Sequence, residues 1–392
     1  MSISRRNFVR AIGLSGLGLS SVGPSLTAAN NESAGAAQPT NRLYDAGFIN
    51  LSSNTSPRGP SEAVLNVLNE RITKGLGRYP ENVGVLTEAI AAREEAQVNS
   101  TFHCCFSDQV LLSTGSGEVL VGAVRAFVTP SRPLVIGHPS YETPIRTCEA
   151  LDLPVKTIAV NDTWQLNLDE MAEAAHGAGL VYLCNPNNPT GVGHSRRAIR
   201  EFVEWVVEAS PDTAILIDEA YIEFAKDPAI ATALPLALAN PNVMITRTFS
   251  KIHAMAGLRI GYAIGHADTL ERMRTVARFG SVNVLSAAAA LVSLQDSDRI
   301  EWEISENHKV REFTLSAFRE MGCRITDSQT NFVWVDVNRS PEAFREACFS
   351  LDVLVGRDFP SPSNTYSRIS LGTMEEMREA VAVFKKVLSS TA

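Results

Sequence analysis

The sequence predicts an α/β fold in which helices cover both faces of a mostly parallel sheet, followed by a smaller α+β domain. Between residues 84 and 295, apolar runs of strand length alternate with helical patterns, as is typical of a buried parallel sheet. After residue 296 the pattern changes to a long charged helix with short strands. A chain of 392 residues, 45% hydrophobic and 20% charged, is long enough for two domains.

The individual elements follow from these patterns in chain order. Residues 38–83 are predicted to form an N-terminal arm and a helix that begins at the Pro60-Ser61 turn. The large domain, residues 84–295, is predicted to contain helices at 84–98, 118–127 and 196–208, and strands at 109–113, 133–137, 155–160, 180–184, 214–217, 243–246 and 258–264. The small domain, residues 296–392, is predicted to contain helices at 298–321, 341–350 and 374–388, and strands at 332–336 and 367–371.

The net charge and the cysteines argue against two classes of function. A net charge of −8 argues against a surface for nucleic acid or anionic lipid, so no nucleic-acid partner is expected. The six cysteines include no Cys-x-x-Cys pair and no histidine at a zinc-binding spacing, so no metal site is predicted.

Residues 1–37 are predicted to be a twin-arginine signal peptide with a linker. The segment Ser4-Arg-Arg-Asn-Phe-Val-Arg10 has paired arginines followed by one polar and two apolar residues, as in that export signature. The apolar run from Ala11 to Gly23 is too short to cross a bilayer, so no stable membrane span is expected in the mature chain. We expect export by the twin-arginine machinery to the periplasm; the alternative is a disordered tail with a chance arginine pair.

Two loops that follow predicted strands carry polar groups suited to a ligand. Ligands in open α/β sheets bind beyond the carboxyl ends of the strands. After strand 109–113, the glycine-containing turn at Ser116 and Gly117 opens a helix whose backbone amides could hold a phosphate, although such a turn is more often only structural. After strand 180–184, two prolines constrain the loop and direct the Asn188 amide toward the same edge, where an Asx-type turn is the alternative.

The next two strands end in residues that carry chemistry. Asp218 follows a buried strand and needs a partner, which a protonated pyridine nitrogen would supply, and Tyr221 could reach a hydroxyl of the same ring. Lys251 stands beside Ser250 in a loop that leaves a buried strand, which is where a lysine that forms a Schiff base would lie. Arg259 could hold an anion there, although a lone Ser-Lys pair is usually a solvated surface feature.

Taken together and in order, these residues resemble the fold-type I pyridoxal-phosphate aminotransferases, and most closely the histidinol-phosphate aminotransferase-like branch. The resemblance covers nearly all of the chain after residue 45. The matching motifs are Asn188-Pro-Thr-Gly191, Asp218-x-x-Tyr221, Ser250-Lys251, Arg259, Leu51 to Pro57, Arg78-Tyr-Pro80, Pro139-Ser-Tyr141, Asn283 to Ser286 and Ser367 to Gly372.

The resemblance implies a role for each matching residue. Lys251 would bind the pyridoxal 5′-phosphate and move the substrate proton, while Asp218 would keep the pyridine nitrogen protonated. Tyr221 and Asn188 would hold the O3′ oxygen of the cofactor. The other implied contacts are Tyr141 stacked on the ring, Ser116, Gly117, Ser250 and Arg259 on the phosphate, Tyr79 of the partner subunit on the same phosphate, Arg368 on the substrate carboxylate, and Asn54 on an arm that closes over the site. A homodimer with sites at the interface is therefore expected.

Two positions depart from the family's pattern. Gly117 replaces an acidic residue after the phosphate-loop serine and keeps the backbone amide. Arg357, the predicted substrate contact near the carboxyl end, is displaced by one residue in Val355-Gly-Arg357, so histidinol phosphate is not assigned as the substrate. For His253, two residues after the lysine, a packing or solvent-facing role is preferred over substrate contact.

The predicted function is an aminotransferase that moves an amino group between an amino donor and a 2-oxo acid by a ping-pong cycle. Two alternatives stay open from the sequence. A decarboxylase, lyase or racemase could use the same site, because these reactions differ mainly in which bond at Cα is broken. The other alternative is a non-catalytic protein that uses this fold for binding.

Overall fold

The computed structural model describes residues 48–77, 79, 83–97, 107–359 and 365–389, all of which belong to one compact unit, residues 45–392. The predicted twin-arginine segment, residues 1–37, lies outside the described residues.

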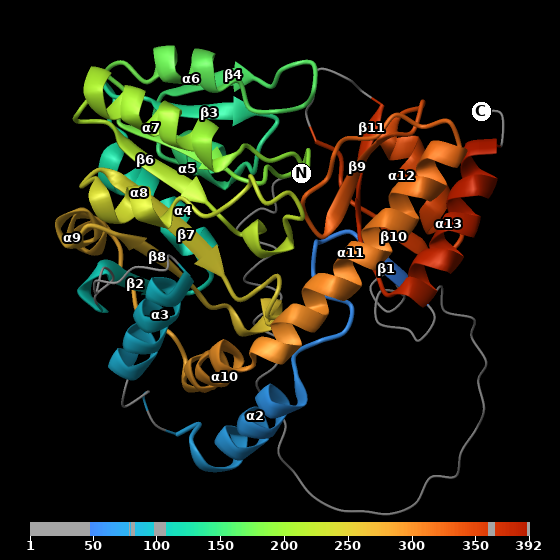
Figure 1. The fold of residues 1–392 in the computed structure, drawn as a ribbon, viewed down its shortest axis with the longest axis horizontal. Helices are drawn as coiled ribbons and strands as arrows, with labels where there is room; N and C mark the ends of the chain where they lie inside the picture. Colours follow the sequence, from blue (N-terminus) through green and yellow to red (C-terminus); the bar gives the residue numbers. More distant parts are fainter. Residues whose placement is uncertain (1–47, 78, 80–82, 98–106, 360–364, 390–392) are drawn as a thin grey trace, which may run out of the picture. The chain divides into compact units, whose positions relative to one another are not determined.

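A seven-stranded sheet forms the centre of the fold, in the order β2-β8-β7-β6-β5-β3-β4 (Figure 1). Its strands are β2 (Val110–Ser113), β3 (Leu134–His138), β4 (Val155–Ala159), β5 (Leu180–Cys184), β6 (Ala214–Asp218), β7 (Val243–Thr248) and β8 (Gly261–Gly265). In this sheet β8 runs opposite to the other six strands, and the pairs that do not include β8 are parallel. The mostly parallel α/β sheet predicted from the sequence is therefore confirmed. The register pairs Cys184 with Asp218 and Asp218 with Thr246, so the ends of β5, β6 and β7 lie side by side.

Helices cover both faces of this sheet, as Figure 1 shows. They are α3 (Val83–Gln97), α4 (Ser116–Phe127), α5 (Thr143–Ala150), α6 (Leu168–Ala174), α7 (Arg196–Ala209), α8 (Leu234–Ala239), α9 (Ala267–Val276) and α10 (Val284–Gln295). Alternate residues of each strand point to opposite faces, so the sheet contributes to two cores. Side chains of α3, α6, α7, α8 and α10 pack with Ile215 and Ile217 on one face, and those of α4, α5 and α9 pack with Ala214 and Leu216 on the other.

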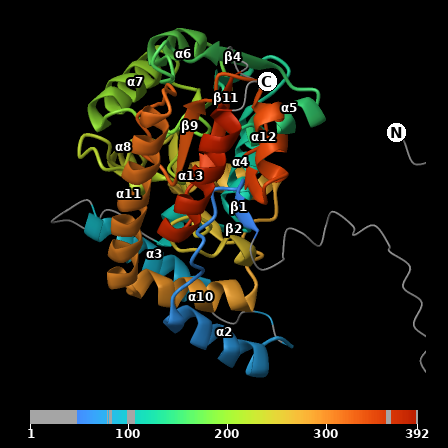
Figure 2. The ribbon, with the colours of Figure 1, turned by 90° about the vertical axis from the view of Figure 1, so that its right-hand side faces the viewer.

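The carboxyl-terminal part combines helices with two small sheets, which face the viewer in Figure 2. Its elements are α11 (Ser297–Glu320), β9 (Phe332–Asp336), α12 (Pro341–Phe349), β10 (Val353–Val355), β11 (Tyr366–Ser370) and α13 (Met374–Ser389). Strands β9 and β11 are antiparallel, and β1 (Ile49–Leu51) pairs in parallel with β10. After β1 the chain runs on to α2 (Glu62–Lys74), which packs against α10.

Several elements differ from the sequence-based expectation. The strand expected at 258–264 begins only at Gly261, because Ala256–Leu258 forms a 3-10 turn and Arg259 is left-handed, with φ of 51°. Pro60 precedes α2 without entering its first turn, since Ser61 is the N-cap and its side chain accepts a hydrogen bond from the Val64 amide. Helix α10 was not predicted because it is apolar nearly all round and so lacks the polar face that marks an amphipathic helix. The domain boundaries at 83 and 295 stay predictions.

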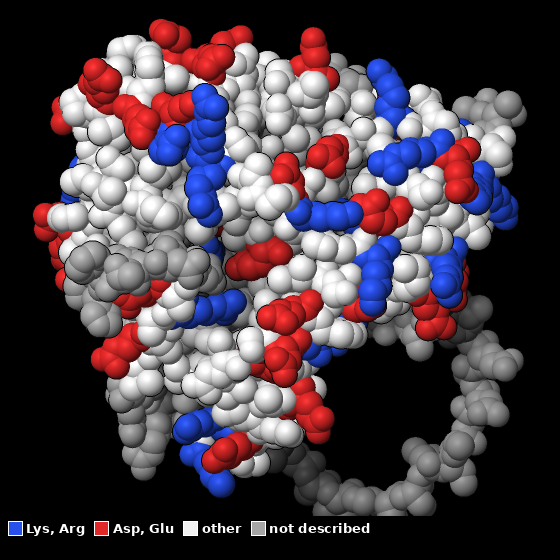
Figure 3. Space-filling model, in the orientation of Figure 1, with Lys and Arg blue, Asp and Glu red and all other residues white. Residues whose placement is uncertain are grey.

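Surface charge, helix hydrophobicity and possible metal ligands are relevant to the partners expected from the sequence. Acidic and basic side chains are intermixed on the face shown in Figure 3. In the described ranges, no helix has both the length and the apolar character needed to cross a bilayer. Nor does this part of the chain bring three or more His, Cys, Asp or Glu side chains together in a way that could hold a metal ion.

Candidate active site

A cavity of about 310 Å³ lies at the edge of the sheet where the parallel strands end. Its size suits a small molecule. The predicted site residues that line it are Asn54, Ser116, Gly117, Tyr141, Asn188, Asp218, Tyr221, Ser250, Lys251, Arg259, Arg357 and Arg368. The structure therefore brings together residues that lie up to 314 positions apart in the chain, from Asn54 to Arg368. Tyr79 is the exception among the predicted site residues: it is 94% exposed and does not line the cavity.

Lys251 projects into this cavity from the loop that follows β7. Its Nζ donates a hydrogen bond to the Ser53 carbonyl oxygen at 3.3 Å and lies 5.6 Å from the centre of the Tyr221 ring. Burial, together with the positive charges of Arg368 and Arg259, lowers the pKa of Lys251 to about 7, although the negative charge of Asp218 opposes this change. A large fraction of the side chain is therefore a free amine at neutral pH, the form that attacks an aldehyde.

The lowered pKa of Lys251 predicts how cofactor attachment depends on pH. Because only the free amine reacts, attachment of pyridoxal phosphate to the cofactor-free protein should reach full rate above pH 7 and fall about tenfold for each pH unit below it. Stopped-flow absorbance between pH 5.5 and 9 would measure this rate. A rate that still rises tenfold per unit up to pH 9 would show that the lysine keeps its ordinary pKa, near 10.5.

Asp218 ends β6 with a side chain that is almost fully buried. The Tyr182 hydroxyl donates to its Oδ2 at 2.9 Å, and the Ala220 amide donates to its Oδ1 at 3.1 Å. Burial raises the pKa of Asp218 to about 6, although these two donors oppose the rise. A buried carboxylate in this position is stabilised by a cation, so the site suits a ligand with a protonated ring nitrogen.

Two amide groups fix the hydroxyl of Tyr221. Asn54 Nδ2 donates to this hydroxyl at 3.1 Å, and Asn188 Nδ2 donates to it at 3.2 Å. Burial raises the pKa of Tyr221, so the phenol keeps its proton at neutral pH. Since its oxygen accepts twice, the hydroxyl proton is left to donate to an oxygen atom of a ligand.

The start of α4 supplies a cradle for an anion. Ser116 and Gly117 are the first residues of this twelve-residue helix, whose free amides and dipole favour negative charge. The Arg259 guanidinium lies against the turn before it, so closely that a side chain at Gly115, which has φ of 77°, would overlap that group. Arg259 Nη1 donates to Ser250 Oγ at 3.3 Å. Helix amides, two hydroxyls and a guanidinium therefore form a donor set suited to phosphate.

Arg368 lies on β11 at the far side of the cavity, with 6% of its surface exposed. Its Nη1 donates to Asn188 Oδ1 at 2.9 Å and its Nη2 donates to the Ser52 carbonyl oxygen at 2.6 Å. Burial lowers its pKa to about 10, so the side chain stays charged at neutral pH. Its buried Nε has no hydrogen-bond partner among the described residues. A buried donor left without a partner indicates that a ligand atom completes the group.

Arg357 reaches the cavity but is already paired. Its Nη2 binds Glu142 at 2.5 Å and its guanidinium lies 4.1 Å from the centre of the Phe359 ring. The pairing with Glu142 weakens its attraction for a second anion. His253 does not line the cavity; it is buried against Ser293, with 2.7 Å between Nδ1 and Oγ.

The sequence reasoning gave no individual role to Tyr182, Ser52 or Ser53, which contact the site residues. Tyr182 holds Asp218, and its signal was a phenol inside an otherwise aliphatic buried strand, which needs a hydrogen-bond partner. The carbonyl groups of Ser52 and Ser53 contact Arg368 and Lys251 through the backbone. Such contacts have no side-chain signature in a sequence.

A comparison with models of protein families identifies the family to which the chain belongs. The model of aminotransferase class I and II matches residues 46–384. The chain belongs to this family.

Two curated relatives agree with the family match, and a solved structure of another protein shares the fold. The histidinol-phosphate aminotransferase of Chromohalobacter salexigens is 32% identical over 356 residues, covering 89% of this chain and 94% of that protein. The enzyme of the same name from Methanothermobacter thermautotrophicus is 33% identical over 361 residues, covering 88% and 90%. The crystal structure of histidinol-phosphate aminotransferase from Sinorhizobium meliloti, in complex with pyridoxal-5′-phosphate, has a TM-score of 0.80 at 24% identity and covers 92% of this chain and 97% of that one.

The cavity of this aminotransferase fits pyridoxal 5′-phosphate. The anion cradle at α4 suits its phosphate, the buried carboxylate of Asp218 suits its ring nitrogen, and the Lys251 amine suits its aldehyde. The hydroxyl of Tyr221 is placed to donate to a ring oxygen. Each functional group of the cofactor thus has a chemically complementary group in one cavity.

Proposed function

We propose that this aminotransferase, with pyridoxal phosphate as its cofactor, moves an amino group from a donor that carries an anionic group to a 2-oxo acid. The unpartnered, buried Nε of Arg368 carries the proposal, because it adds a free donor on a charged group to a cavity that already has a separate phosphate cradle. The anionic group is a carboxylate or a phosphate, and either would bind the guanidinium by the same chemistry.

The chain's own residues would share the chemistry as follows. When bound, pyridoxal phosphate supplies a ring that accepts the electron pair released when a bond at the donor's Cα breaks. The Asp218 carboxylate stabilises positive charge at the ring nitrogen, and Lys251 Nζ takes and returns the donor's proton as a general base and acid. Arg368 orients the donor by its anionic group. Because donor and acceptor would use the same cavity, they would bind in turn, as in a ping-pong cycle.

The substitution Arg368→Gln tests the anion contact. A hydrogen-bonded charge pair contributes about 1.5–3 kcal/mol, so kcat/KM for the anionic donor should fall roughly 10- to 150-fold. The measurement uses two matched pairs of donors, L-phenylalanine with 2-phenylethylamine and L-histidinol phosphate with L-histidinol.

In each pair only the first member has the anion in question. If Arg368 binds that anion, the higher kcat/KM of the first member over the second should disappear in the variant. The pair that shows the effect identifies carboxylate or phosphate. An undiminished advantage for both anionic donors would contradict the role of Arg368.

A homodimer is the second part of the proposal. Apolar side chains are exposed along one side of α2 and the residues after it: Leu65 is 47% exposed, Ile72 50% and Leu76 58%. Exposed apolar faces of this kind mark protein interfaces. Tyr79, which is 94% exposed next to them, would be available to a second copy's cavity. Light scattering tests the dimer: a mass near 42.4 kDa, that of one chain, would contradict it.

Export to the periplasm by the twin-arginine route is the third part. It rests on Arg5 and Arg6 and on the apolar run that follows, which lie outside the described residues. A reporter fused to residues 1–40 should be exported, and a change of both arginines to lysine should keep it in the cytoplasm. A reporter whose export ignores that change would contradict this route.

A further inference from the structure

The segment from Ser52 to Arg58 crosses the cavity with its backbone in contact with the reactive groups. Three consecutive carbonyl oxygens accept hydrogen bonds: that of Ser52 from Arg368 at 2.6 Å, that of Ser53 from Lys251 at 3.3 Å, and that of Asn54 from Asn331 at 3.0 Å. The Asn54 side chain also donates to Tyr221. The path of this segment therefore determines which atoms surround the lysine and the arginine.

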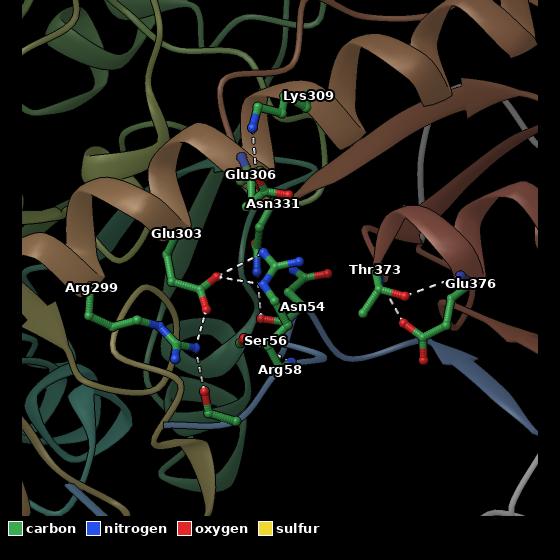
Figure 4. Close-up of polar contacts among 12 residues, drawn as sticks. Asn54, Ser56, Arg58, Arg299, Glu303, Glu306, Lys309, Asn331, Thr373 and Glu376 are labelled. Carbon is green, nitrogen blue, oxygen red and sulfur yellow. Dashed lines mark hydrogen bonds and ion pairs between the residues drawn. The ribbon is translucent and has the colours of Figure 1, made fainter. Parts of the chain in front are cut away.

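The far end of this segment is held by one buried carboxylate, that of Glu303 on α11 (Figure 4). Arg58 donates to Glu303 Oε2 through Nε at 3.1 Å and Nη2 at 2.8 Å. Arg299 donates through Nη2 to Glu303 Oε1 at 2.5 Å and to the Gly59 carbonyl oxygen at 2.9 Å. The Glu303 side chain is 4% exposed, and both guanidinium groups lie about 5 Å from the Trp302 ring.

We infer that Glu303 is a positioning residue for transamination, which acts by holding Ser52–Asn54 against Lys251, Tyr221 and Arg368. The segment is held before its start by the β1–β10 pairing, at Asn54 by hydrogen bonds with Ser370 and Asn331, and at its far end by the Glu303 carboxylate. Without that carboxylate, two guanidinium groups would face each other with no charge between them, and their repulsion would release the Arg58 end. Asn54, four residues from Arg58, keeps its hydrogen bonds with Ser370 and Asn331 but would then shift relative to the Tyr221 hydroxyl.

This inference rests on the proposed function, since positioning has meaning only for an active enzyme. Glu303 does not line the active-site cavity; it shares with Lys251 only a small neighbouring cavity of about 10 Å³. A double-mutant cycle with Asn54 can therefore tell whether its effect on catalysis passes through the segment. A role in fold stability alone would lower the melting temperature but would leave the segment's mobility and the coupling to Asn54 unchanged.

The test compares Glu303→Ala with Glu306→Gln in the holoenzyme. Glu306 lies one turn further along α11 and pairs with the exposed Lys309, so it is a matched control (Figure 4). Hydrogen exchange of residues 52–59 should become about tenfold faster in Glu303→Ala. Its kcat/KM with the best donor among L-glutamate, L-phenylalanine and L-histidinol phosphate should fall about 100-fold, because small misplacements cost that much. Glu306→Gln should change either quantity about twofold or less.

A double-mutant cycle with Asn54→Ala separates positioning from stability. If Glu303 acts through Asn54, Glu303→Ala should cost only about threefold more in the Asn54→Ala background. Arg58→Ala leaves Glu303 paired with Arg299, so this variant should stay folded even if Glu303→Ala does not. It should show the same faster exchange of residues 52–59 and the same non-additive loss of kcat/KM with Asn54→Ala. Additive losses, or exchange equal to that of Glu306→Gln, would overturn the inference. A wild type that converts none of the donors would instead contradict the proposed donor class, and the exchange comparison would still test the anchor.

Discussion

Replacing Lys251 with alanine should reduce transamination by about 10³- to 10⁴-fold or more, because general acid–base catalysis alone contributes a factor of this order and the covalent attachment is lost as well. The lysine lies in the cavity with its pKa lowered to about 7, and it is the predicted site lysine that lines the cavity. Single-turnover conversion of the bound cofactor by an amino donor would measure the loss. Added methylamine should restore part of the rate, since it can replace the missing base.

Lys226→Ala is the matched control for this variant. Lys226 is exposed and pairs with Glu312 at 3.6 Å, so its removal should change the rate about twofold or less. A Lys251→Ala protein that transaminates within tenfold of the wild-type rate would contradict the assignment of Lys251 as the base.

Replacing Asp218 with asparagine should reduce kcat by about 10²- to 10³-fold, the usual effect of removing one preorganised electrostatic group. The substitution keeps the size of the side chain and removes only its charge, so the ring nitrogen of the cofactor loses its counter-charge. Steady-state kinetics with a saturating donor would measure the change, and KM should change much less than kcat because the donor does not bind to this residue.

Tyr182→Phe is a milder probe of the same carboxylate. It removes one hydrogen bond to Asp218, which should cost about tenfold in kcat. Because that bond holds the pKa of Asp218 down, its loss should raise the pKa and move the acidic limb of the pH–rate profile to higher pH. An Asp218→Asn enzyme as active as Tyr182→Phe would show that the charge of Asp218 is not needed.

Much of the site could be predicted from the sequence because parallel strands leave a simple signal. Asp218 and Lys251 each come just after an apolar run, and the carboxyl ends of such runs meet at one edge of the sheet. The distances between them could not be predicted, because they depend on the strand order, in which β6 and β7 are neighbours. The pairing of Arg357 with Glu142, 215 residues away, is a long-range contact of the same kind.

The backbone hydrogen bonds and the buried ion pairs were the features of the site that the sequence predicted least well. Ser52 and Ser53 act through carbonyl groups, which every residue has. The ion pair between Glu303 on α11 and Arg58 joins residues that are 245 positions apart. In the sequence such a glutamate cannot be distinguished from a solvated side chain of a charged helix. The partner-subunit role predicted for Tyr79 stays a prediction, because a single chain does not test it.

An absorbance titration of the purified holoenzyme with a panel of amino donors tests the central claim most directly. The panel includes L-glutamate, L-phenylalanine and L-histidinol phosphate. We predict that at least one donor converts the bound cofactor to pyridoxamine phosphate and releases one equivalent of the matching oxo product, and that a 2-oxo acid then reverses the change. A bound cofactor that no donor converts, or a donor that loses carbon dioxide or is racemised without forming pyridoxamine phosphate, would contradict the account.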